Sequence, residues 1–331
     1  MRAVVAERYG GPEVLAIAER EPPEVRPGDV RIAVRAASLN PLDFKIRDGK
    51  VKLVLPLRPP IALGCDVAGV VERVGANVTR FAVGDLVYVR LEKDRMGALA
   101  ELAVADERVV AKKPARATFE EAASIPLAAL TALQALREAA GLRAGQRVLV
   151  HAGAGGVGSL AIQIGKILGL TVATTTSTRN VELVRGLGAD QVIDYTKNEP
   201  LPEGQDAVFD TLGGASELAS IAATRRGGTV VGVGGLPDEA FARERLPAWL
   251  RPALWLMTAR RRRAAARAGV RFTYLFMRPD GAQLAELAAW IDEGKLRPLL
   301  HGTFPFTLDG VRGAFRELEG GRARGKIVVT I

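Results

Sequence analysis

A glycine-rich turn at residues 153–158 constrains the fold of this chain more than any other stretch. It follows an apolar, β-branched run at Val148–Val150 and carries the spacing Gly153-x-Gly155-x-x-Gly158. The apolar residues after it recur at helical spacing, so the turn leaves a strand and opens a helix. That context is typical of a dinucleotide-binding turn in a parallel α/β sheet, whereas a glycine motif alone is weak evidence.

Each glycine of the turn has its own role in such a site. Gly153 allows the tight turn, Gly155 lets backbone N–H groups approach a pyrophosphate, and Gly158 lets the helix pack closely on the strand. The helix N-terminus adds free N–H donors and partial positive charge at the anion. The predicted cofactor-binding residues of the turn are Gly153, Ala154, Gly155, Gly156, Val157 and Gly158. A βαβ turn without a ligand is the alternative that stays open.

The size and composition of the chain predict two domains in a reducing compartment. At 331 residues the chain is long enough for two separate cores. Its only cysteine, Cys65, excludes an intramolecular disulfide framework. Residues 1–8 carry charges too early for a signal peptide, and no apolar run reaches the ~20 residues of a membrane-spanning helix. We therefore expect a soluble, cytoplasmic protein.

The strand and helix patterns differ between the two halves of the chain. Short strand-like runs separated by turn residues fill residues 1–115, with little helix, which is typical of a β-rich barrel or folded sheet. From residue 147 onward, six strand-like runs alternate with helical runs, which predicts a doubly wound parallel sheet. Residues 299–304 and 326–330 resemble the first half again. The predicted domains are therefore 1–120, completed by 280–331, and 121–279.

The +9 net charge of the chain is concentrated in one segment. Residues 243–271 hold nine arginines and one acid, Glu244, so this segment alone carries +8. Without a nucleic-acid-binding motif or an aromatic stacking pattern, we expect no nucleic-acid partner. The segment also contains an apolar run, Leu246–Met257, with two tryptophans. We favour a cover over a substrate site or a subunit interface with solvated arginines, and weak contact of 246–271 with an anionic membrane is the alternative.

The end of the second predicted sheet strand favours NADP(H) over NAD(H). A site for NAD usually places an acid there, on the ribose 2′-hydroxyl. The stretch 173–180 contains no acid but offers Ser177 and Arg179. A guanidinium forms charge-assisted hydrogen bonds with phosphate, so these residues suit a 2′-phosphate. The alternative for Arg179 is a solvated residue in the first turn of the next helix.

Several motifs together resemble the medium-chain dehydrogenase/reductase superfamily. Besides the glycine turn, they are Asn40–Gly49, Gly64–Val71, Gly84–Tyr88, Val192–Tyr195, Asp210–Gly213 and Gly325–Val328. The resemblance spans nearly the whole chain and is strongest to the zinc-independent quinone oxidoreductase branch, which includes enone reductases. It implies a GroES-like catalytic domain, a Rossmann domain, an active site between the two domains and a homodimer.

The resemblance also implies roles for individual residues. Three of them would act at the nicotinamide or the substrate: Asn40, Lys45 and Thr131. Further cofactor contacts would come from Ser177, Arg179, Tyr195, Leu212, Val233, Gly234 and Lys326. For three of these residues, an interpretation without a role in binding or catalysis stays open. Thr131 could bond its own helix backbone, Lys45 could be an exposed helix residue, and Tyr195 could simply pack.

Zinc is not expected, although zinc-dependent alcohol dehydrogenases belong to the same superfamily. In the resemblance, Asn40 stands where a zinc-binding cysteine would be, and Cys65 stands where a histidine ligand would be. The two histidines of the chain, His151 and His301, match no ligand position, and there is no four-cysteine lobe. We expect Cys65 to be a small buried residue.

These observations predict a zinc-independent, NADPH-dependent oxidoreductase that transfers hydride to an α,β-unsaturated carbonyl or a quinone. The resemblance puts the quinone in doubt, because bacterial quinone reductases carry tyrosines at the positions of Lys45 and Val51. Lys45 follows the enone-reductase pattern, in which an ammonium could orient a substrate carbonyl. The alternative from a different class is an NADP(H)-binding scaffold or a peripheral membrane protein with little catalysis.

Overall fold

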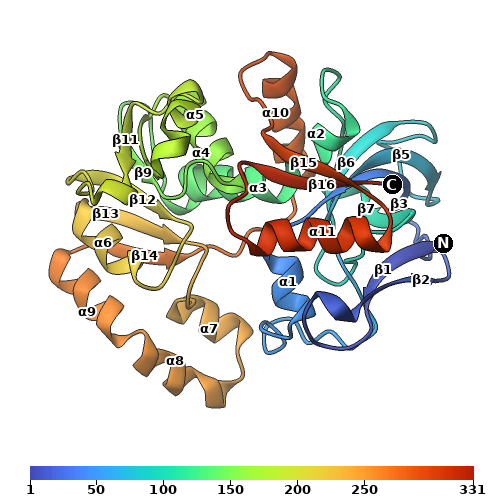
Figure 1. Cartoon of the computed structure of the whole chain (residues 1–331), viewed down its shortest axis with the longest axis horizontal. Helices are drawn as coiled ribbons and strands as arrows, with labels where there is room; N and C mark the ends of the chain where they lie inside the picture. Colours follow the sequence, from blue (N-terminus) through green and yellow to red (C-terminus); the bar gives the residue numbers. More distant parts are fainter. The chain divides into compact units, whose positions relative to one another are not determined.

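The computed structural model describes residues 1–331, which divide into two compact units. Unit 1 comprises Met1–Leu130 and Arg278–Ile331, and unit 2 comprises Thr131–Met277 (Figure 1). The first boundary lies after Leu130 and not after residue 120, because helix α2 (Phe119–Ala123) packs on strands of unit 1. The C-terminal segment Arg278–Ile331 belongs to the same unit as residues 1–130.

Unit 2 contains a six-stranded parallel sheet in the order β11-β10-β9-β12-β13-β14. The chain starts in the middle, winds outward to one edge and then returns to build the other half, so the predicted Rossmann topology is confirmed. The strands are β9 (Arg147–Val150), β10 (Thr171–Thr176), β11 (Gln191–Asp194), β12 (Gln205–Asp210), β13 (Thr224–Gly232) and β14 (Arg271–Tyr274).

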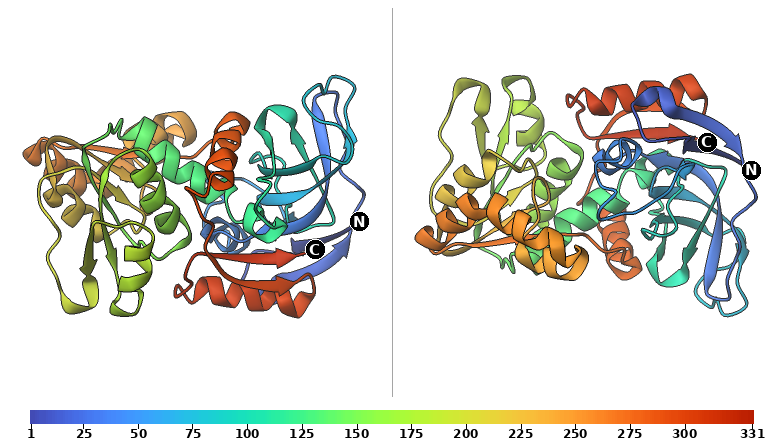
Figure 2. Two further views of the ribbon diagram at one scale, coloured as in Figure 1. Left: turned by 90° about the horizontal axis from the view of Figure 1, so that it is seen from above. Right: turned by 90° about the horizontal axis from the view of Figure 1, so that it is seen from below.

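The helices of unit 2 are α4 (Gly156–Ile167), α5 (Val181–Gly186), α6 (Ser216–Ala223), α7 (Glu239–Arg245), α8 (Arg251–Met257) and α9 (Ala259–Ala268). Of these helices, α4, α5, α6 and α9 contact strands of this sheet, whereas α7 and α8 contact each other (Figure 2). Helix α3 (Pro126–Leu133) spans the boundary between the units and continues into a π-helical segment at Gln134–Ala139. As expected from its prolines, the segment between β13 and β14 is broken into short helices and not one continuous helix.

Unit 1 is built on two sheets. A three-stranded sheet has the order β2-β1-β4, and a seven-stranded sheet has the order β15-β16-β3-β5-β6-β8, with β7 also paired to β3. Their strands are β1 (Arg2–Ala6), β2 (Leu15–Glu19), β3 (Asp29–Ser38), β4 (Ile61–Ala62), β5 (Asp66–Val74), β6 (Leu86–Arg90), β7 (Leu102–Asp106), β8 (Val110–Lys112), β15 (Leu300–Pro305) and β16 (Lys326–Thr330). The predicted β-rich, GroES-like domain is confirmed, with β16 from the C-terminal segment lying beside β3.

Unit 1 also contains more helix than its sequence pattern indicated. Besides α2 and α10 (Gly281–Asp292), it has α1 (Pro41–Arg47) and α11 (Leu308–Glu319). Helix α11 begins at Thr307, whose hydroxyl accepts from the N–H of Gly310, and it buries Val311, Ala314 and Phe315. This apolar spacing is helical, but the two glycines within the helix obscure it. No helix of the chain is long and apolar enough to span a membrane.

Candidate active site

The glycine turn of unit 2 has the geometry of an anion cradle. Gly155 caps the 12-residue helix α4 in an extended conformation. A Cβ atom on Gly158 would lie 2.2 Å from the carbonyl oxygen of Ala152, and one on Gly153 would lie 2.1 Å from Thr174 Oγ1. At Gly155, which precedes the helix N-terminus, a Cβ atom would lie 3.3 Å from the carbonyl oxygen of Ala152, which is also a tight contact. The turn therefore fits a dinucleotide pyrophosphate.

The backbone at the entrance to the turn is strained, and neighbouring side chains hold it. Ala152 has a φ of 54°, in the left-handed region that favours glycine. Its N–H donates to Thr175 Oγ1 at 3.1 Å. The same hydroxyl lies 3.1 Å from Nδ1 of the buried His151, and Nε2 of His151 lies 3.1 Å from Ser220 Oγ. Burial lowers the pKa of His151, which favours the neutral imidazole in this network.

Three predicted cofactor residues lie at the neighbouring ends of two strands. The register pairs the last residues of β10 and β11, so Ser177 and Tyr195 leave the sheet side by side. Arg179 lies in the exposed turn that follows Ser177, and Tyr195 is 60% exposed. The adjacent carboxylate of Asp194 accepts hydrogen bonds from Thr178 and Thr196, and these bonds lower its pKa. The exposed surface at this edge therefore presents a hydroxyl, a guanidinium and an aromatic ring.

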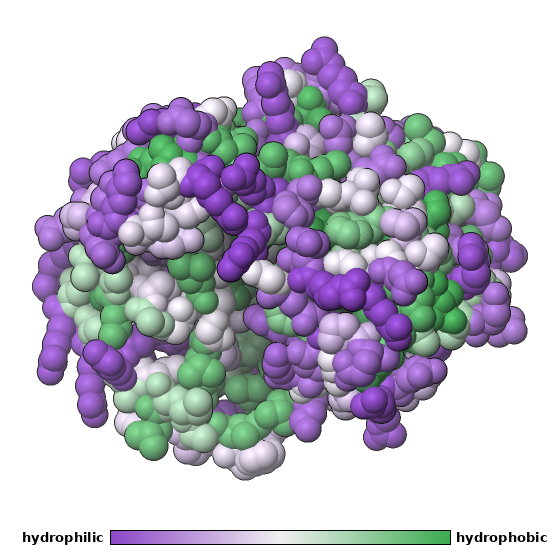
Figure 3. Space-filling model, in the orientation of Figure 1, coloured by the Kyte–Doolittle hydropathy of each residue, from purple (hydrophilic) through white to green (hydrophobic).

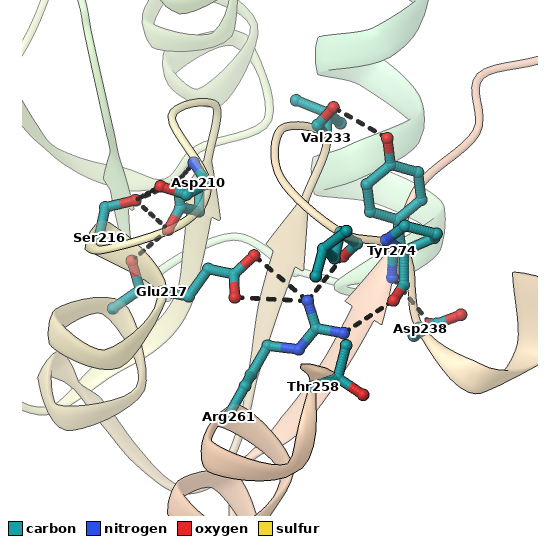
Figure 4. A network of polar contacts seen from close by, with 12 residues as sticks. Asp210, Ser216, Glu217, Val233, Asp238, Thr258, Arg261 and Tyr274 are labelled. Carbon is teal, nitrogen blue, oxygen red and sulfur yellow. Dashed lines mark hydrogen bonds and ion pairs between the residues drawn. The ribbon is translucent and has the colours of Figure 1, made fainter. Parts of the chain in front are cut away.

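The loops after β12 and β13 are in contact at the same edge of the sheet. The Asp210 carboxylate accepts from the N–H groups of Leu212 and Gly213, each at 2.9 Å, and from Ser216 Oγ (Figure 4). A Cβ atom on Gly213 would lie only 2.3 Å from the backbone nitrogen of Gly235, so the two loops touch. Leu212 is exposed, whereas Val233 and Gly234 are half-buried.

An arginine of the basic segment holds the second of these loops in place. Arg261 of α9 donates to the carbonyl oxygens of Leu236 and Pro237, at 2.6 and 2.9 Å, and forms a buried ion pair with Glu217 (Figure 4). Its guanidinium also stacks on Phe272, 4.0 Å from the ring centroid. The expectation that the arginines of this segment are all solvated is therefore wrong for Arg261. Sequence spacing gave no sign of this role, because its partners come from three other elements.

In unit 1, Asn40 belongs to a buried polar cluster with Asp66 and Lys326. Asn40 Nδ2 donates to Asp66 Oδ2 at 2.9 Å and approaches Cys65 Sγ at 3.6 Å. Asn40 Oδ1 accepts from Lys326 Nζ at 2.5 Å. The ammonium of Lys326 thus points into unit 1, toward Asn40, a placement that the sequence did not reveal. Asn40 is also the N-cap of helix α1, where it forms a capping box with Asp43.

Burial changes the protonation of two neighbours of this cluster. Asp43 is fully buried, and desolvation raises its pKa from 3.8 to about 7, against the hydrogen bonds that it accepts from the N–H groups of Asn40 and Gly64. Burial also raises the pKa of Cys65, which is 0% exposed, as expected for a small core residue.

The two remaining predicted residues lie on short helices. Lys45 is half-buried on α1, so it is not the fully exposed residue of the alternative interpretation. Thr131 lies on α3, is 5% exposed, and is the first residue of unit 2.

The side chains of this structure do not fit a catalytic zinc ion. No group of three or more His, Cys, Asp or Glu side chains lies close enough together to hold a metal ion. At the Asn40 cluster, the side chains are an amide, a thiol and the carboxylate of Asp66, and the amide is not one of the thiolates, imidazoles and carboxylates of which zinc needs three or four.

A Rossmann unit with an intact glycine turn, joined to a GroES-like unit, defines a nucleotide-dependent oxidoreductase. The chain matches the alcohol dehydrogenase GroES-like domain over residues 26–115 and the zinc-binding dehydrogenase family over residues 187–329. It belongs to the medium-chain dehydrogenase/reductase superfamily and is an oxidoreductase.

Named relatives align over almost the whole chain. The chain is 37% identical to 2-methylene-furan-3-one reductase of Solanum lycopersicum, over 99% of this chain and 79% of the relative. It is 38% identical to the NADPH-dependent alkenal/one oxidoreductase of Arabidopsis thaliana, with the same coverage. Among solved structures, the quinone oxidoreductase from Coxiella burnetii superposes with a TM-score of 0.86 at 34% identity, covering 100% of this chain and 99% of that one.

Proposed function

We propose that this oxidoreductase uses NADPH to reduce the C=C bond of α,β-unsaturated carbonyl compounds, with quinones as slower substrates. The observation that carries the proposal is the edge of the Rossmann sheet, where the glycine cradle lies beside a strand end that offers Ser177 and Arg179. The names of two relatives, a furanone reductase and an alkenal/one oxidoreductase, support the substrate class.

In this proposal, backbone and side-chain groups of the chain bind the cofactor, orient the substrate and polarise its carbonyl group. The N–H groups at the start of α4 bind the pyrophosphate, and Arg179 with Ser177 binds the 2′-phosphate. The loops at Leu212 and at Val233–Gly234 line the path toward the nicotinamide. Bound NADPH supplies the hydride. The other residues that we assign to the cofactor are Tyr195, beside the adenine, and the turn residues Ala154, Gly156 and Val157.

We assign the groups at the reacting end to unit 1 and to α3. The Lys45 ammonium orients the substrate carbonyl and stabilises the enolate oxygen that develops when hydride reaches the β-carbon. Asn40 and Thr131 position the nicotinamide. This chemistry needs no metal, since a positioned cation can stabilise an enolate, and we therefore propose that the enzyme is zinc-independent.

A substrate panel tests the proposed activity. NADPH oxidation is measured with linear alkenals, cyclic enones, benzoquinones and naphthoquinones, and with saturated aldehydes as the negative set. We expect the enones to have the highest kcat/KM and chelators to have no effect. If no member of the panel raises NADPH oxidation above background, the proposal is wrong.

Replacing Arg179 tests the proposed cofactor preference. Arg179→Ala is expected to raise the KM for NADPH roughly 10- to 100-fold, the loss of a charge-assisted hydrogen bond, and to leave the KM for NADH nearly unchanged. Arg185→Ala is the matched control, because Arg185 is exposed and pairs only with Glu182, one turn earlier on the same helix. Equal changes for the two cofactors would refute the role of Arg179.

The apolar surface of α8 favours a second role as a contact surface. Four large side chains on and next to this helix are between 52% and 73% exposed: Trp249, Trp255, Leu256 and Met257. Figure 3 shows a hydrophobic area where Figure 1 draws α8, and arginines flank this apolar run in the sequence. Patches of this kind mark interaction sites, and we infer contact with a second copy in a homodimer, with an anionic membrane surface as the alternative.

Light scattering and vesicle co-sedimentation separate these two partners. Trp249→Ser with Trp255→Ser is expected to convert a dimer into a monomer if the partner is a second copy. If the partner is a membrane, the same variant stays in its wild-type oligomeric state and loses binding to anionic vesicles. If neither the oligomeric state nor vesicle binding changes in this variant, these side chains do not form a contact surface.

A further inference from the structure

Lys326 is placed opposite Asn40 by the register of two strands. It is the first residue of β16, which runs antiparallel to β3 and pairs Val328 with Ser38. Lys326 precedes Val328 by two residues, and Asn40 follows Ser38 by two residues. Because the strands are antiparallel, Lys326 therefore faces Asn40 across the ladder. The backbone of unit 1 thus fixes where this side chain starts.

The ammonium of Lys326 lies within a shell of oxygen atoms. It donates to the carbonyl oxygen of Leu39 at 2.9 Å and to Asn40 Oδ1 at 2.5 Å, and it lies 3.5 Å from Asp66 Oδ2. The side chains of Lys326 and Asp66 are only 7% and 0% exposed. Further hydrogen bonds to the Asp66 carboxylate come from Ser38 Oγ, Asn40 Nδ2 and the N–H of Leu127.

This arrangement disagrees with the metal chemistry of the family. The matching family is described as zinc-binding, and Asn40 and Cys65 stand where the resemblance puts two zinc ligands. The amide of Asn40 is not a zinc ligand of the usual kind. Both oxygens of Asp66 already accept hydrogen bonds from groups of the protein.

We propose that the Lys326 ammonium stands in the place of the catalytic metal of zinc-dependent relatives and closes this site to a metal ion. One positive charge balances the buried carboxylate of Asp66, and a buried carboxylate without a partner is costly. A divalent ion near the same oxygens would face the ammonium at short range and be repelled. This proposal rests on the metal-free reduction proposed above. Its tests measure metal binding and stability and not catalysis, so the proposal about Lys326 and the proposed activity can fail independently.

Introducing zinc ligands at the Asn40 cluster tests directly whether Lys326 excludes a metal ion. Two variants carry Asn40→Cys and Cys65→His, which with Asp66 give three zinc ligands, and one of them also carries Lys326→Ala. Each is titrated with cobalt(II), whose visible absorption reports thiolate ligation. We expect the triple variant to bind one equivalent and the double variant to bind at least about 100-fold more weakly. Equal binding by both, or none by a folded triple variant, would overturn the proposal.

A single substitution in the full chain keeps the proposal testable if the rebuilt variants do not fold. Lys326→Met leaves Asp66 without its cation and is expected to lower the thermal midpoint by about 10 °C. Lys112→Met is the matched control, because Lys112 is 71% exposed and pairs with Asp85 at the surface of unit 1. Methylammonium is expected to restore part of the lost midpoint in Lys326→Ala. If the Lys326 and Lys112 variants melt alike, Lys326 is not the balancing cation.

Discussion

The glycine turn of unit 2 and the Asn40 cluster of unit 1 are built in opposite ways. At the turn, missing side chains and backbone N–H groups make the site, and added atoms at Gly153 or Gly158 would collide with the chain itself. At the cluster, one buried ion pair and the neutral polar side chains around it, from three strand ends and a helix cap, make the site. The first kind of site depends on space and the second on charge balance, so different substitutions should damage each.

The largest expected effect is at the centre of the cluster. Asp66→Ala leaves the buried ammonium of Lys326 without its carboxylate, and we expect a loss of about 3–5 kcal/mol in the free energy of unfolding. Glu72→Ala on the same strand is the matched control, since its ion pair with Arg31 lies at the surface and contributes less than about 1 kcal/mol. Denaturant unfolding of both variants measures the difference. Similar losses would show that buried charge is not what holds the cluster.

A smaller effect is expected at the glycine turn, where an added side-chain atom causes the damage and no charge is lost. The Cβ of Gly158→Ala would lie 2.2 Å from the Ala152 oxygen, so the turn must open. We expect NADPH to bind 10- to 100-fold more weakly, which corresponds to about 1–3 kcal/mol of overpacking. At Gly186 an added Cβ meets nothing within 4 Å, so Gly186→Ala should leave affinity unchanged. Titration calorimetry compares them, and an unaffected Gly158 variant would contradict the role of close packing.

The smallest effect is a pH dependence of stability at the edge of the turn. Burial lowers the pKa of His151, so the native state binds fewer protons than the unfolded chain below about pH 6.5, and stability falls as the pH falls. The slope from this residue is at most about 1.4 kcal/mol per pH unit. Asp43, whose pKa is raised to about 7, acts with the opposite sign between about pH 4 and 7.

Because these two residues oppose each other, the measurement is the difference between wild type and His151→Gln. The stability of wild type relative to the variant is expected to decrease on acidification from pH 7 to pH 5. His301→Gln, in unit 1, controls for the loss of a histidine. A difference that stays constant across this range would mean that His151 titrates alike in the folded and unfolded states.

The same contrast explains what the sequence could predict. The parallel sheet and its glycine turn follow from local patterns, since strand–turn–helix periodicity and glycine spacing lie within about 20 contiguous residues. The relation of Lys326 to Asn40 depends on strand register between segments 286 residues apart, which no local pattern carries. Arg261 is similar, because its partners Glu217 and Leu236 lie on other elements. The sequence patterns thus pointed to Lys326 and to the basic segment that contains Arg261, but not to the partners of these side chains.

Direct hydride transfer to the β-carbon of an enone is the central claim, and an isotope experiment tests it. The purified enzyme is incubated with a cyclic enone and NADPH deuterated at the transferable position of the nicotinamide, and the product is analysed by NMR and mass spectrometry. We expect one deuterium at the β-carbon of the saturated ketone and a solvent proton at the α-carbon. Deuterium in a carbinol, or a saturated ketone without deuterium at the β-carbon, would contradict the account.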